Sequence, residues 1–318
     1  MYRRFFAVLL TVALLVSSFD IIPLVNAAFI PEFQVKGSGL PKITITIRMP
    51  NSYDDMDRLA AGEYHNVYVN DDGTVIAAGS RKDGRSKVGS WKNIVAISAY
   101  NHTVGLKSDG TVVATGLNTS GQCNVSGWKN ITAVAAGNKH TLGLKSDGTV
   151  VAVGSNKSGQ KNVEKWKNIV AVAAGGKNSY GLKADGTVVA CGSNSNKQKN
   201  AADWEGITQL AAGSLHVVGL KSDGTVVAAG SNGYGQCKVS KWKDIVAVSA
   251  GYYFTLGLKS DGTVVSTGDN RYKQCNTKSW KDIVAIAGGT YHAVAIDSKG
   301  KFHFSGNKGY GQRELGKD

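Results

Sequence analysis

Apolar and polar positions form short segments of strand length along this chain, and turn residues separate the segments. Residues 169–174 are an apolar run, whereas residues 140–145 alternate between apolar and polar side chains. Short segments rich in β-branched residues and bounded by Gly, Asn and Asp are typical of β-strands. An Asp-Gly step at residues 147–148 indicates a two-residue hairpin of type I′, followed by a strand over 149–153. A fourth short segment begins at Gly159.

The same unit recurs seven times at intervals of about 38 residues. Its Asp-Gly step falls at Asp72, Asp109, Asp147, Asp185, Asp223 and Asp261, with Lys299-Gly300 in the seventh place. A fixed period of this length indicates one repeated supersecondary unit that buries its apolar faces against its neighbours. Residues 53–318 hold seven complete units, each predicted to be an antiparallel meander of three to four strands.

Seven such units predict an all-β fold, a seven-bladed β-propeller built from repeats of about 38 residues. An open stack would expose its edge strands and need polar capping units, yet the end units here differ only mildly from the rest. We expect Gly143, Ala152 and their equivalents to let the sheets approach closely near the axis. One Trp per unit is expected at the seam between blades. These residues are Trp91, Trp128, Trp166, Trp204, Trp242 and Trp280, with Tyr53 in the first unit.

The N-terminal 52 residues lie outside the repeats. Arg3 and Arg4 precede an apolar run over 5–16, and small residues reach Ala27, a pattern typical of a signal peptide over 1–27. An uncleaved membrane anchor is the alternative. In the remaining segment, 28–52, the alternation over 42–48 predicts one strand, which we expect to add to an outer edge of the first or last blade.

The chain is basic, with 37 Lys and Arg against 23 Asp and Glu and a formal charge of +14. In a secreted protein this charge favours a cell-wall polyanion or an acidic protein surface as partner, and no nucleic acid is expected. We expect a monomer. One predicted face gathers lysines at the Asp-Gly hairpins and after the tryptophans: Lys107, Lys145, Lys183, Lys221, Lys259, Lys92, Lys129, Lys167, Lys243 and Lys281.

The four cysteines do not form a disulfide framework. Cys123, Cys237 and Cys275 occupy the same slot of three different units, and Cys191 lies in another slot. The repeat spacing holds equivalent positions apart, so that only the neighbours Cys237 and Cys275 come into question as a pair. Small, partly buried thiols are the favoured interpretation.

A recurring His indicates structure more than chemistry. His65, His102, His140, His216 and His292 share one slot, with Ser179 and Phe254 in the two remaining units. We expect buried imidazoles that bond to a neighbouring backbone, because blades are too widely spaced for several to reach one metal ion. No catalytic triad, paired carboxylate or phosphate-binding loop stands out, so we expect no enzyme, metal or cofactor.

The string GLKSDGTVVAxGSNxxGQ resembles the repeat of the regulator of chromosome condensation family across residues 53–318. Members of that family are seven-bladed propellers. Residues 268–274 are similar in wording to the secreted bacterial subgroup that includes β-lactamase inhibitory protein type II, a non-enzymatic binder that grips its target through loops on one propeller face. The insertion on which the exchange-factor activity of the eukaryotic member depends is not found.

Strand direction places the AGxxH turns and the SNxxGQ turns on one face, where the variable positions are the candidates for binding a protein partner. Large aromatic residues with polar groups are typical of such hot spots. The candidates are Tyr64, Tyr100, Asn101, Asn138, Lys139, Lys177, Asn178, Leu215, Tyr234, Tyr252, Tyr253, Arg271, Tyr272, Tyr291 and Tyr310.

The sequence therefore predicts a secreted or envelope-associated, non-enzymatic binding module that recognises an unidentified protein through these loops. Two alternatives stay open. One is a module that binds an anionic cell-wall polymer through its lysine face, and the other is a hydrolase or lyase that uses the central channel.

Overall fold

The computed structural model describes residues 20–25, 31–36, 43–46 and 54–316, and the chain divides into two units at Asn51. The first unit holds β1 (Asp20–Val25), β2 (Pro31–Lys36) and β3 (Ile43–Thr46) in one antiparallel sheet. A strand is present within the predicted range 42–48, as β3, but the segment 28–52 also holds β2, where only one strand was predicted. β3 pairs with β2 in a sheet of the first unit, and its addition to the outer edge of a blade stays a prediction. The apolar run over 5–16 lies outside the described residues.

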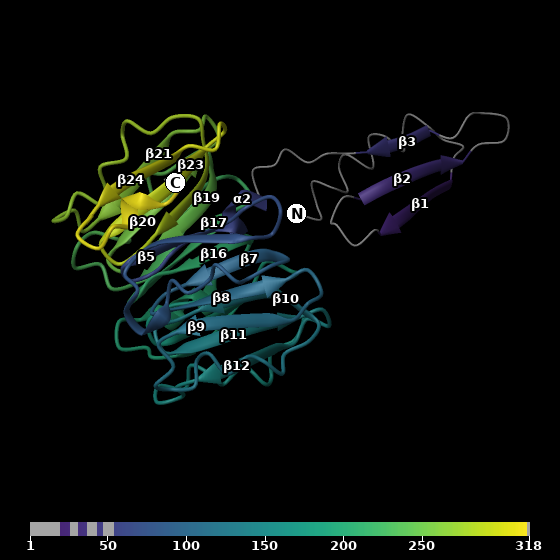
Figure 1. The fold of residues 1–318 in the computed structure, drawn as a ribbon, viewed down its shortest axis with the longest axis horizontal. Coiled ribbons are helices and arrows are strands. Elements are labelled where there is room, and N and C mark those ends of the chain that lie inside the picture. The colour runs from purple at the N-terminus through teal and green to yellow at the C-terminus, as the bar shows by residue number, and fades with distance from the viewer. Residues whose placement is uncertain (1–19, 26–30, 37–42, 47–53, 317–318) are drawn as a thin grey trace. The chain divides into compact units, whose positions relative to one another are not determined.

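The second unit consists of seven three-stranded antiparallel sheets, the blades of a seven-bladed β-propeller (Figure 1). A short helix, α2 (Asp54–Arg58), precedes blade 1. The blades, in chain order, are β4 (Leu59–Ala61), β5 (His65–Val69) and β6 (Val75–Gly79); β7 (Ile94–Ala99), β8 (His102–Lys107) and β9 (Val112–Gly116); β10 (Ile131–Ala136), β11 (His140–Lys145) and β12 (Val150–Gly154); β13 (Ile169–Ala174), β14 (Asn178–Lys183) and β15 (Val188–Gly192); β16 (Ile207–Ala212), β17 (His216–Lys221) and β18 (Val226–Gly230); β19 (Ile245–Ala250), β20 (Phe254–Lys259) and β21 (Val264–Gly268); β22 (Ile283–Gly288), β23 (His292–Asp297) and β24 (Phe302–Gly306).

The fourth segment of each unit is made of turns and short 3-10 helices. These helices are η1 (Lys82–Gly84), η2 (Gln198–Asp203) and η3 (Gln312–Glu314). Each of them also contacts the outer strand of the following blade, as η3 contacts β6 of blade 1. The fourth segments therefore act as braces between neighbouring blades, and the last one closes the ring.

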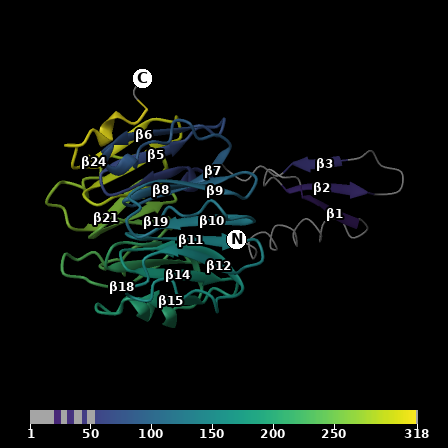
Figure 2. The same ribbon diagram turned by 60° about the horizontal axis from the view of Figure 1, so that its bottom comes forward.

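Apolar cores form between blades, which explains why one unit alone could not be stable. One buried cluster joins Val294 and Ile296 of blade 7 to Leu59 and Ala78 of blade 1. Figures 1 and 2 show the C-terminal blade beside the N-terminal one, as this cluster requires. The propeller is thus closed by the same kind of packing that holds its internal seams.

The recurring tryptophans lie at these seams, as predicted. Trp128 packs against a cluster that contains Val104 of blade 2 and Ile131 of blade 3. A Cβ atom placed on Gly143 would lie only 2.6 Å from the Trp128 ring. Our expectation that this glycine serves close approach at the axis is therefore wrong, because the indole ring fills the space above it.

The Asp-Gly hairpin also differs from the prediction. Gly148 has a φ of 77°, whereas Asp147 is not among the residues with positive φ, so the turn is not of type I′. The Gly148 N–H donates to the Lys145 carbonyl at 3.0 Å, and the Lys145 N–H donates to the Thr149 carbonyl at 2.9 Å. This is a three-residue loop with a type I turn and a left-handed glycine. The Asp147 carboxylate accepts bonds from the N–H and hydroxyl of Thr149, which favours this geometry.

Within the described part of the chain, no helix is both long and apolar enough to cross a membrane.

Candidate functional site

A cluster of seven tyrosines, named here the tyrosine cluster, lies on one face of the propeller. Its members come from both kinds of variable turn: Tyr64, Tyr252, Tyr253 and Tyr291 from the turns between first and second strands, and Tyr234, Tyr272 and Tyr310 from the turns after third strands. The Tyr64 and Tyr310 ring centroids are 4.5 Å apart, although the two residues come from different kinds of turn. The prediction that both turns share a face is therefore confirmed.

Ring contacts link the seven side chains without a break. Tyr253 contacts Tyr252 at 4.4 Å and Tyr234 at 4.9 Å between ring centroids. Tyr291 joins the two halves, with centroid distances of 4.9 Å to Tyr272, 6.2 Å to Tyr64 and 6.5 Å to Tyr252. Tilted and edge-to-face pairs at these distances are favourable aromatic contacts. The rings thus hold one another in place.

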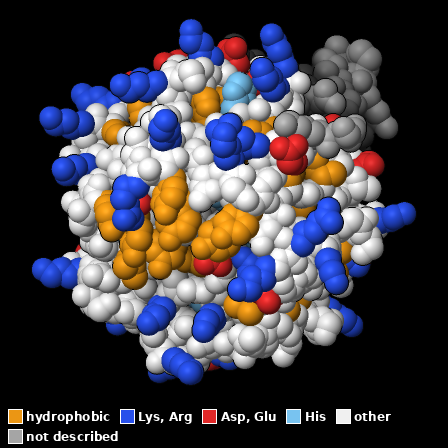
Figure 3. Space-filling model, turned by 60° about the vertical axis from the view of Figure 1, so that its left-hand side comes forward, with side chains coloured by type: hydrophobic (Ala, Val, Ile, Leu, Met, Phe, Trp, Pro, Cys, Tyr) orange, Lys and Arg blue, Asp and Glu red, His pale blue; other side chains and the backbone are white. Residues whose placement is uncertain are grey.

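Much of this aromatic surface stays open to solvent. Tyr234, Tyr272 and Tyr310 are 45%, 47% and 50% exposed, and they are three of the five most exposed large hydrophobic residues in the described part of the chain. Figure 3 shows one face of the molecule on which hydrophobic and Tyr side chains form a continuous patch bordered by Lys and Arg. Large exposed apolar patches are typical of interaction sites.

Arg271 is fixed at the edge of the cluster. Its Nε and Nη2 donate to the two carboxylate oxygens of Asp269, each at 2.9 Å. Its guanidinium carbon lies 4.8 Å from the centroid of the Tyr234 ring. The hydrogen bond from Arg271 also lowers the pKa of the buried Asp269 carboxyl. A guanidinium held in this bidentate way is rigid, so Arg271 orients Tyr234 rather than moving freely.

Burial raises the pKa of several phenols in the cluster. That of Tyr64 rises to about 12, and those of Tyr253 and Tyr291 also lie above the ordinary value. At neutral pH these three phenols are therefore uncharged, with hydroxyl groups that can donate hydrogen bonds. The cluster offers large apolar area with polar edges.

The remaining predicted site residues lie apart from the ring contacts. Lys139 and Lys177 are exposed, and Leu215 is half-buried. Tyr100 is half-buried with a buried hydroxyl, and burial raises its pKa. Its polar neighbour is Ser214 of blade 5, although Tyr100 belongs to blade 2. Tyr100 therefore reaches across the propeller.

Two of the predicted binding residues are structural. Asn178 begins β14 and is 2% exposed, with its Nδ2 donating to the Ser193 carbonyl. Asn101 is 8% exposed and donates from Nδ2 to Asn138 Oδ1 at 2.7 Å. Their assignment to a binding surface is wrong, because their amides bond to neighbouring loops. Asn138 remains half-buried at the surface.

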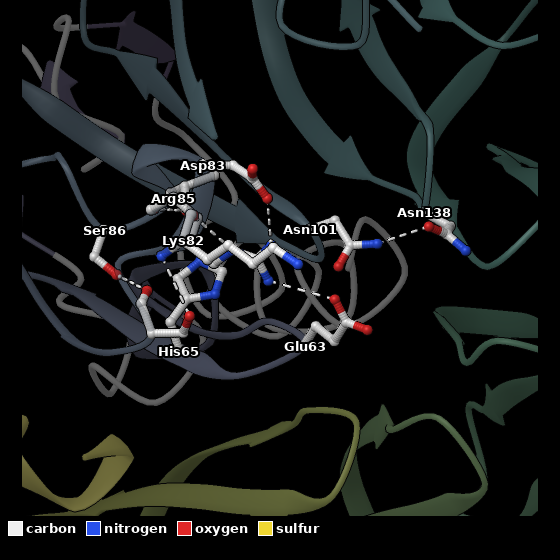
Figure 4. A network of polar contacts seen from close by, with 10 residues as sticks. Glu63, His65, Lys82, Asp83, Arg85, Ser86, Asn101 and Asn138 are labelled. Atoms are coloured by element: carbon white, nitrogen blue, oxygen red, sulfur yellow. Dashed lines mark hydrogen bonds and ion pairs between the residues drawn. The ribbon is translucent and has the colours of Figure 1, made fainter. Parts of the chain in front are cut away.

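An ionic network that the sequence reasoning missed occupies blade 1 of the same face (Figure 4). Arg85 is 3% exposed, and its guanidinium contacts Glu63 at 3.4 Å and Asp83 at 3.1 Å. A signal was available, because Arg85 stands where the other six units carry a buried Gln, such as Gln122. The arginine thus neutralises two of the acidic side chains on this face.

The histidine slot forms a buried ring of inter-blade hydrogen bonds. His65 Nε2 lies 2.7 Å from the Thr103 hydroxyl in the next blade, and His102 Nε2 lies 2.7 Å from the Thr141 hydroxyl in the blade after that. The Thr103 hydroxyl in turn donates to the Arg85 carbonyl at 2.7 Å, so it accepts from the imidazole Nε2–H. The predicted buried imidazoles are confirmed, but their direct partner is a side chain rather than the backbone. The other pairs are His140 with Ser179, His216 with Thr255, and His292 with Asn66.

One slot assignment needs correction. Asn178, not Ser179, occupies the histidine slot of blade 4, and Ser179 is the hydrogen-bond acceptor for His140. The histidine slot and the slot of the accepting hydroxyl in the next blade change together. Where Asn178 replaces the histidine, the next blade carries Val217 in place of the hydroxyl, and where Phe254 replaces it, the next blade carries Ala293. Where the imidazole is missing, the hydroxyl is missing too, so no buried hydroxyl is left without its donor.

Burial lowers the pKa of all five imidazoles, to about 3 for His65 and His102 and to about 4 for His140, His216 and His292. They are neutral at any physiological pH. Across the described residues, no three His, Cys, Asp or Glu side chains gather in a way that could hold a metal ion.

The four cysteines are free and half-buried. The thiol of Cys237 lies 3.2 Å from the Ser231 carbonyl, and that of Cys275 lies 3.3 Å from the Asp269 carbonyl. Burial raises the pKa of each thiol to about 11. A thiol that stays protonated at neutral pH is a poor nucleophile.

The opposite face carries the Asp-Gly hairpins and the Trp-Lys turns. Ser146 N–H donates to the Asn130 carbonyl at 2.9 Å, which joins a hairpin to a Trp-Lys turn and confirms that the two lie on one face. Lysines after the tryptophans, such as Lys129, are exposed, whereas those before the hairpins, such as Lys145, are half-buried.

Five of the units match the model of the regulator of chromosome condensation (RCC1) repeat, over residues 94–122, 131–160, 169–198, 207–236 and 245–274. These five units are similar to RCC1 repeats. No curated protein sequence matches the chain.

Several solved structures have a similar fold. The CRINKLY WD40 ectodomain of the receptor kinase ACR4 from Arabidopsis thaliana is 19% identical, with 80% of this chain and 96% of that chain covered and a TM-score of 0.64. Prp20p from Saccharomyces cerevisiae is 18% identical, with coverage of 78% and 81% and a TM-score of 0.58. Yeast RCC1 (Prp20) bound to Kap60 is 16% identical, with coverage of 91% and 88% and a TM-score of 0.59.

Proposed function

We propose that this RCC1-repeat propeller is a non-enzymatic binding module that recognises a protein partner through the tyrosine cluster. The observation that carries the proposal is the continuous ring contact of seven tyrosines from four blades, three of them about half exposed. Tyr offers a large, rigid and amphipathic contact area at low cost in side-chain entropy, and it is enriched in binding hot spots. Because the rings already pack on one another, little ordering remains to be done on binding.

The proteins of similar fold support this proposal. Prp20p is described with binding properties toward Gsp1p and histones, and yeast RCC1 (Prp20) has been solved bound to Kap60. These partners belong to those proteins. What carries over is that a propeller of this kind presents a face to another protein.

A place outside the cell or in its envelope is part of the proposal. The basic N-terminus and the apolar run over 5–16 favour export. The amino-acid sequence of residues 268–274 favours the secreted bacterial subgroup named above.

A capture experiment tests the proposal. The wild-type chain and a Tyr252/Tyr253/Tyr291→Ala variant are immobilised and exposed to secreted and envelope fractions of the producing organism. A Val95/Val170→Ala variant serves as control, because it removes two other apolar side chains that are 48% and 50% exposed. Thermal melting establishes that all three fold.

We expect partners that wild type and the control recover and that the tyrosine variant recovers at least tenfold less. Equal recovery of every partner by all three chains would contradict the proposal. A partner lost equally from both variants would also count against it, since the loss would then be unrelated to the cluster.

A further inference from the structure

A cationic hollow lies at the seam between blades 6 and 7, next to the tyrosine cluster. Its volume is about 520 Å³, and its lining includes Tyr272, Lys273, Asn276, Phe304, Lys308 and Arg313. Tyr272 belongs to the hollow and to the cluster, since its ring centroid is 4.9 Å from that of Tyr291. The hollow is therefore continuous with the surface proposed above to bind a protein.

The three cations are peculiar to this seam. At the six other seams, the positions equivalent to Lys273, Lys308 and Arg313 hold at most one basic residue. In order of the seams from blades 1–2 onward, these positions are Gly84, Asn118 and Cys123; Gly121, Asn156 and Lys161; Gly159, Asn194 and Lys199; Lys197, Asn232 and Cys237; Gly235, Asn270 and Cys275; and, between blades 7 and 1, Gly311, Arg81 and Ser86.

Lys273 stands in a place where its own backbone is strained. It has a φ of 67°, in the left-handed region, where the equivalent position in five other blades is a glycine. A non-glycine residue there costs on the order of 1 kcal/mol. The remaining equivalent, Lys197 of blade 4, shares this strain with a φ of 61°, so the strain alone does not single out the seam between blades 6 and 7.

Lys308 replaces a residue that locks the turn. The equivalent Asn118, Asn232 and Asn270 each accept, at their Oδ1, the N–H of the residue five positions later. A lysine has no acceptor and cannot make this bond. Two of the three cations therefore stand where another residue suits the fold better, so the repeat structure does not account for them.

Within the described part of the chain, the three cations form no ion pair with an acidic side chain, since the ion pairs there do not include Lys273, Lys308 or Arg313. Two acids of the neighbouring turns are bound to arginines, Asp269 to Arg271 and Glu63 to Arg85, and Glu314 follows Arg313 in the sequence. The lining of the hollow itself holds three cations and no acidic side chain, beside the aromatic rings of Tyr272 and Phe304.

We propose that this hollow receives the carboxylate of an Asp or Glu side chain from an acidic segment of the protein partner, while neighbouring residues of that segment lie on the tyrosine cluster. The proposal rests on the proposed function and names the chemistry of the partner. Lysine and arginine bind the carboxylate, and the two aromatic rings cover its aliphatic stem.

Peptide display on the intact chain tests this inference. Random peptides are selected on wild type, and their affinities are compared with those for two variants of equal charge change. The first, Lys273→Gly, Lys308→Asn and Arg313→Ser, installs residues that other blades carry at these positions. The control, Lys161→Ser, Lys199→Ser and Lys238→Asn, removes three lysines from other seams.

We expect selected peptides to be enriched in Asp and Glu, to bind the first variant at least tenfold more weakly, and to bind the control within about threefold of wild type.

The Tyr252/Tyr253/Tyr291→Ala variant separates the two proposals. Peptides that need the tyrosines but show no acidic enrichment, or bind the first variant as tightly as wild type, overturn the carboxylate site alone. If no selected peptide needs the tyrosines, both proposals fail. If the first variant and the control lost peptide affinity equally, and polyphosphate competed with the peptides, the chain would bind polyanions in general and the carboxylate site would be contradicted.

Discussion

His292 Nε2 lies 2.8 Å from Asn66 Oδ1, and this hydrogen bond joins the last blade to the first across 226 residues of sequence. Asn66 then donates from Nδ2 to the Gln312 carbonyl at 3.0 Å. Both side chains are buried. The ring is therefore closed by a polar chain of the same kind that links His65 to Thr103 inside it.

Breaking this closure should destabilise the propeller. In Asn66→Ala the His292 N–H and the Gln312 carbonyl lose their partners in a buried site, which costs about 1–3 kcal/mol in the free energy of unfolding. Urea denaturation of the purified chain measures this cost. The matched variant is His292→Phe with Asn66→Ala, which copies the native pair Phe254 and Ala293. We expect the double variant to be more stable than Asn66→Ala alone, and a double variant that is less stable would contradict the role of the pair.

The buried imidazoles predict a loss of stability in weak acid. Their pKa values in the folded chain, about 3 to 4, lie below the ordinary value of 6.5, so the unfolded chain binds protons that the folded chain does not. The stabilisation is complete above pH 6.5 and is lost as the pH falls toward about 4. Each imidazole loses about 1.4 kcal/mol per pH unit in that window, so five lose about 6 kcal/mol between pH 7 and 5.5. Urea denaturation at several pH values measures the slope.

One imidazole can be removed as a control. His102→Phe with Thr141→Ala should reduce the number of protons taken up on unfolding near pH 5 by about one of five. If the slope of the free energy of unfolding against pH did not change, His102 would not be a buried, neutral imidazole in the folded chain.

The seam glycines offer a packing test. A Cβ on Gly143 would lie 2.6 Å from the Trp128 ring, so Gly143→Ala should cost about 1–3 kcal/mol in the free energy of unfolding. Gly127→Ala is the matched control, since no heavy atom lies within 4 Å of a Cβ placed there. Thermal or urea unfolding of both variants compares them, and equal stabilities would mean that the indole ring can move away at little cost.

The repeat made the fold and the face that carries the tyrosine cluster predictable, because its period sets the blade count and its strand directions sort the turns. All seven members of the tyrosine cluster were candidates for this reason. Details that depend on local competition were not predictable. The Asp147 side chain bonds to Thr149 and selects a type I turn, where residue preference alone favoured type I′.

Contacts between turns also could not be predicted from the sequence. Asn178 was assigned to a loop because it replaces the histidine of the AGxxH pattern of other units, which normally marks the start of the strand. The strand nevertheless begins at Asn178. The ion pair between Arg85 and Glu63 joins two turns across 22 residues of sequence. Periodicity gives the place of a residue within its unit, whereas such contacts depend on which side chains from neighbouring turns meet.

The strained Lys273 separates stability from binding in a final test. Lys273→Gly removes a left-handed lysine and installs the residue that five other blades carry, so the free energy of unfolding should stay unchanged or rise by up to about 1 kcal/mol. Affinity for the display-selected acidic peptides should fall, because one of three cations of the hollow is gone. The reverse exchange at the neighbouring seam, Gly235→Lys with its φ of 83°, should cost stability. If Lys273→Gly instead lowered stability and left binding intact, the lysine would serve the fold, and the strain would have no part in recognition.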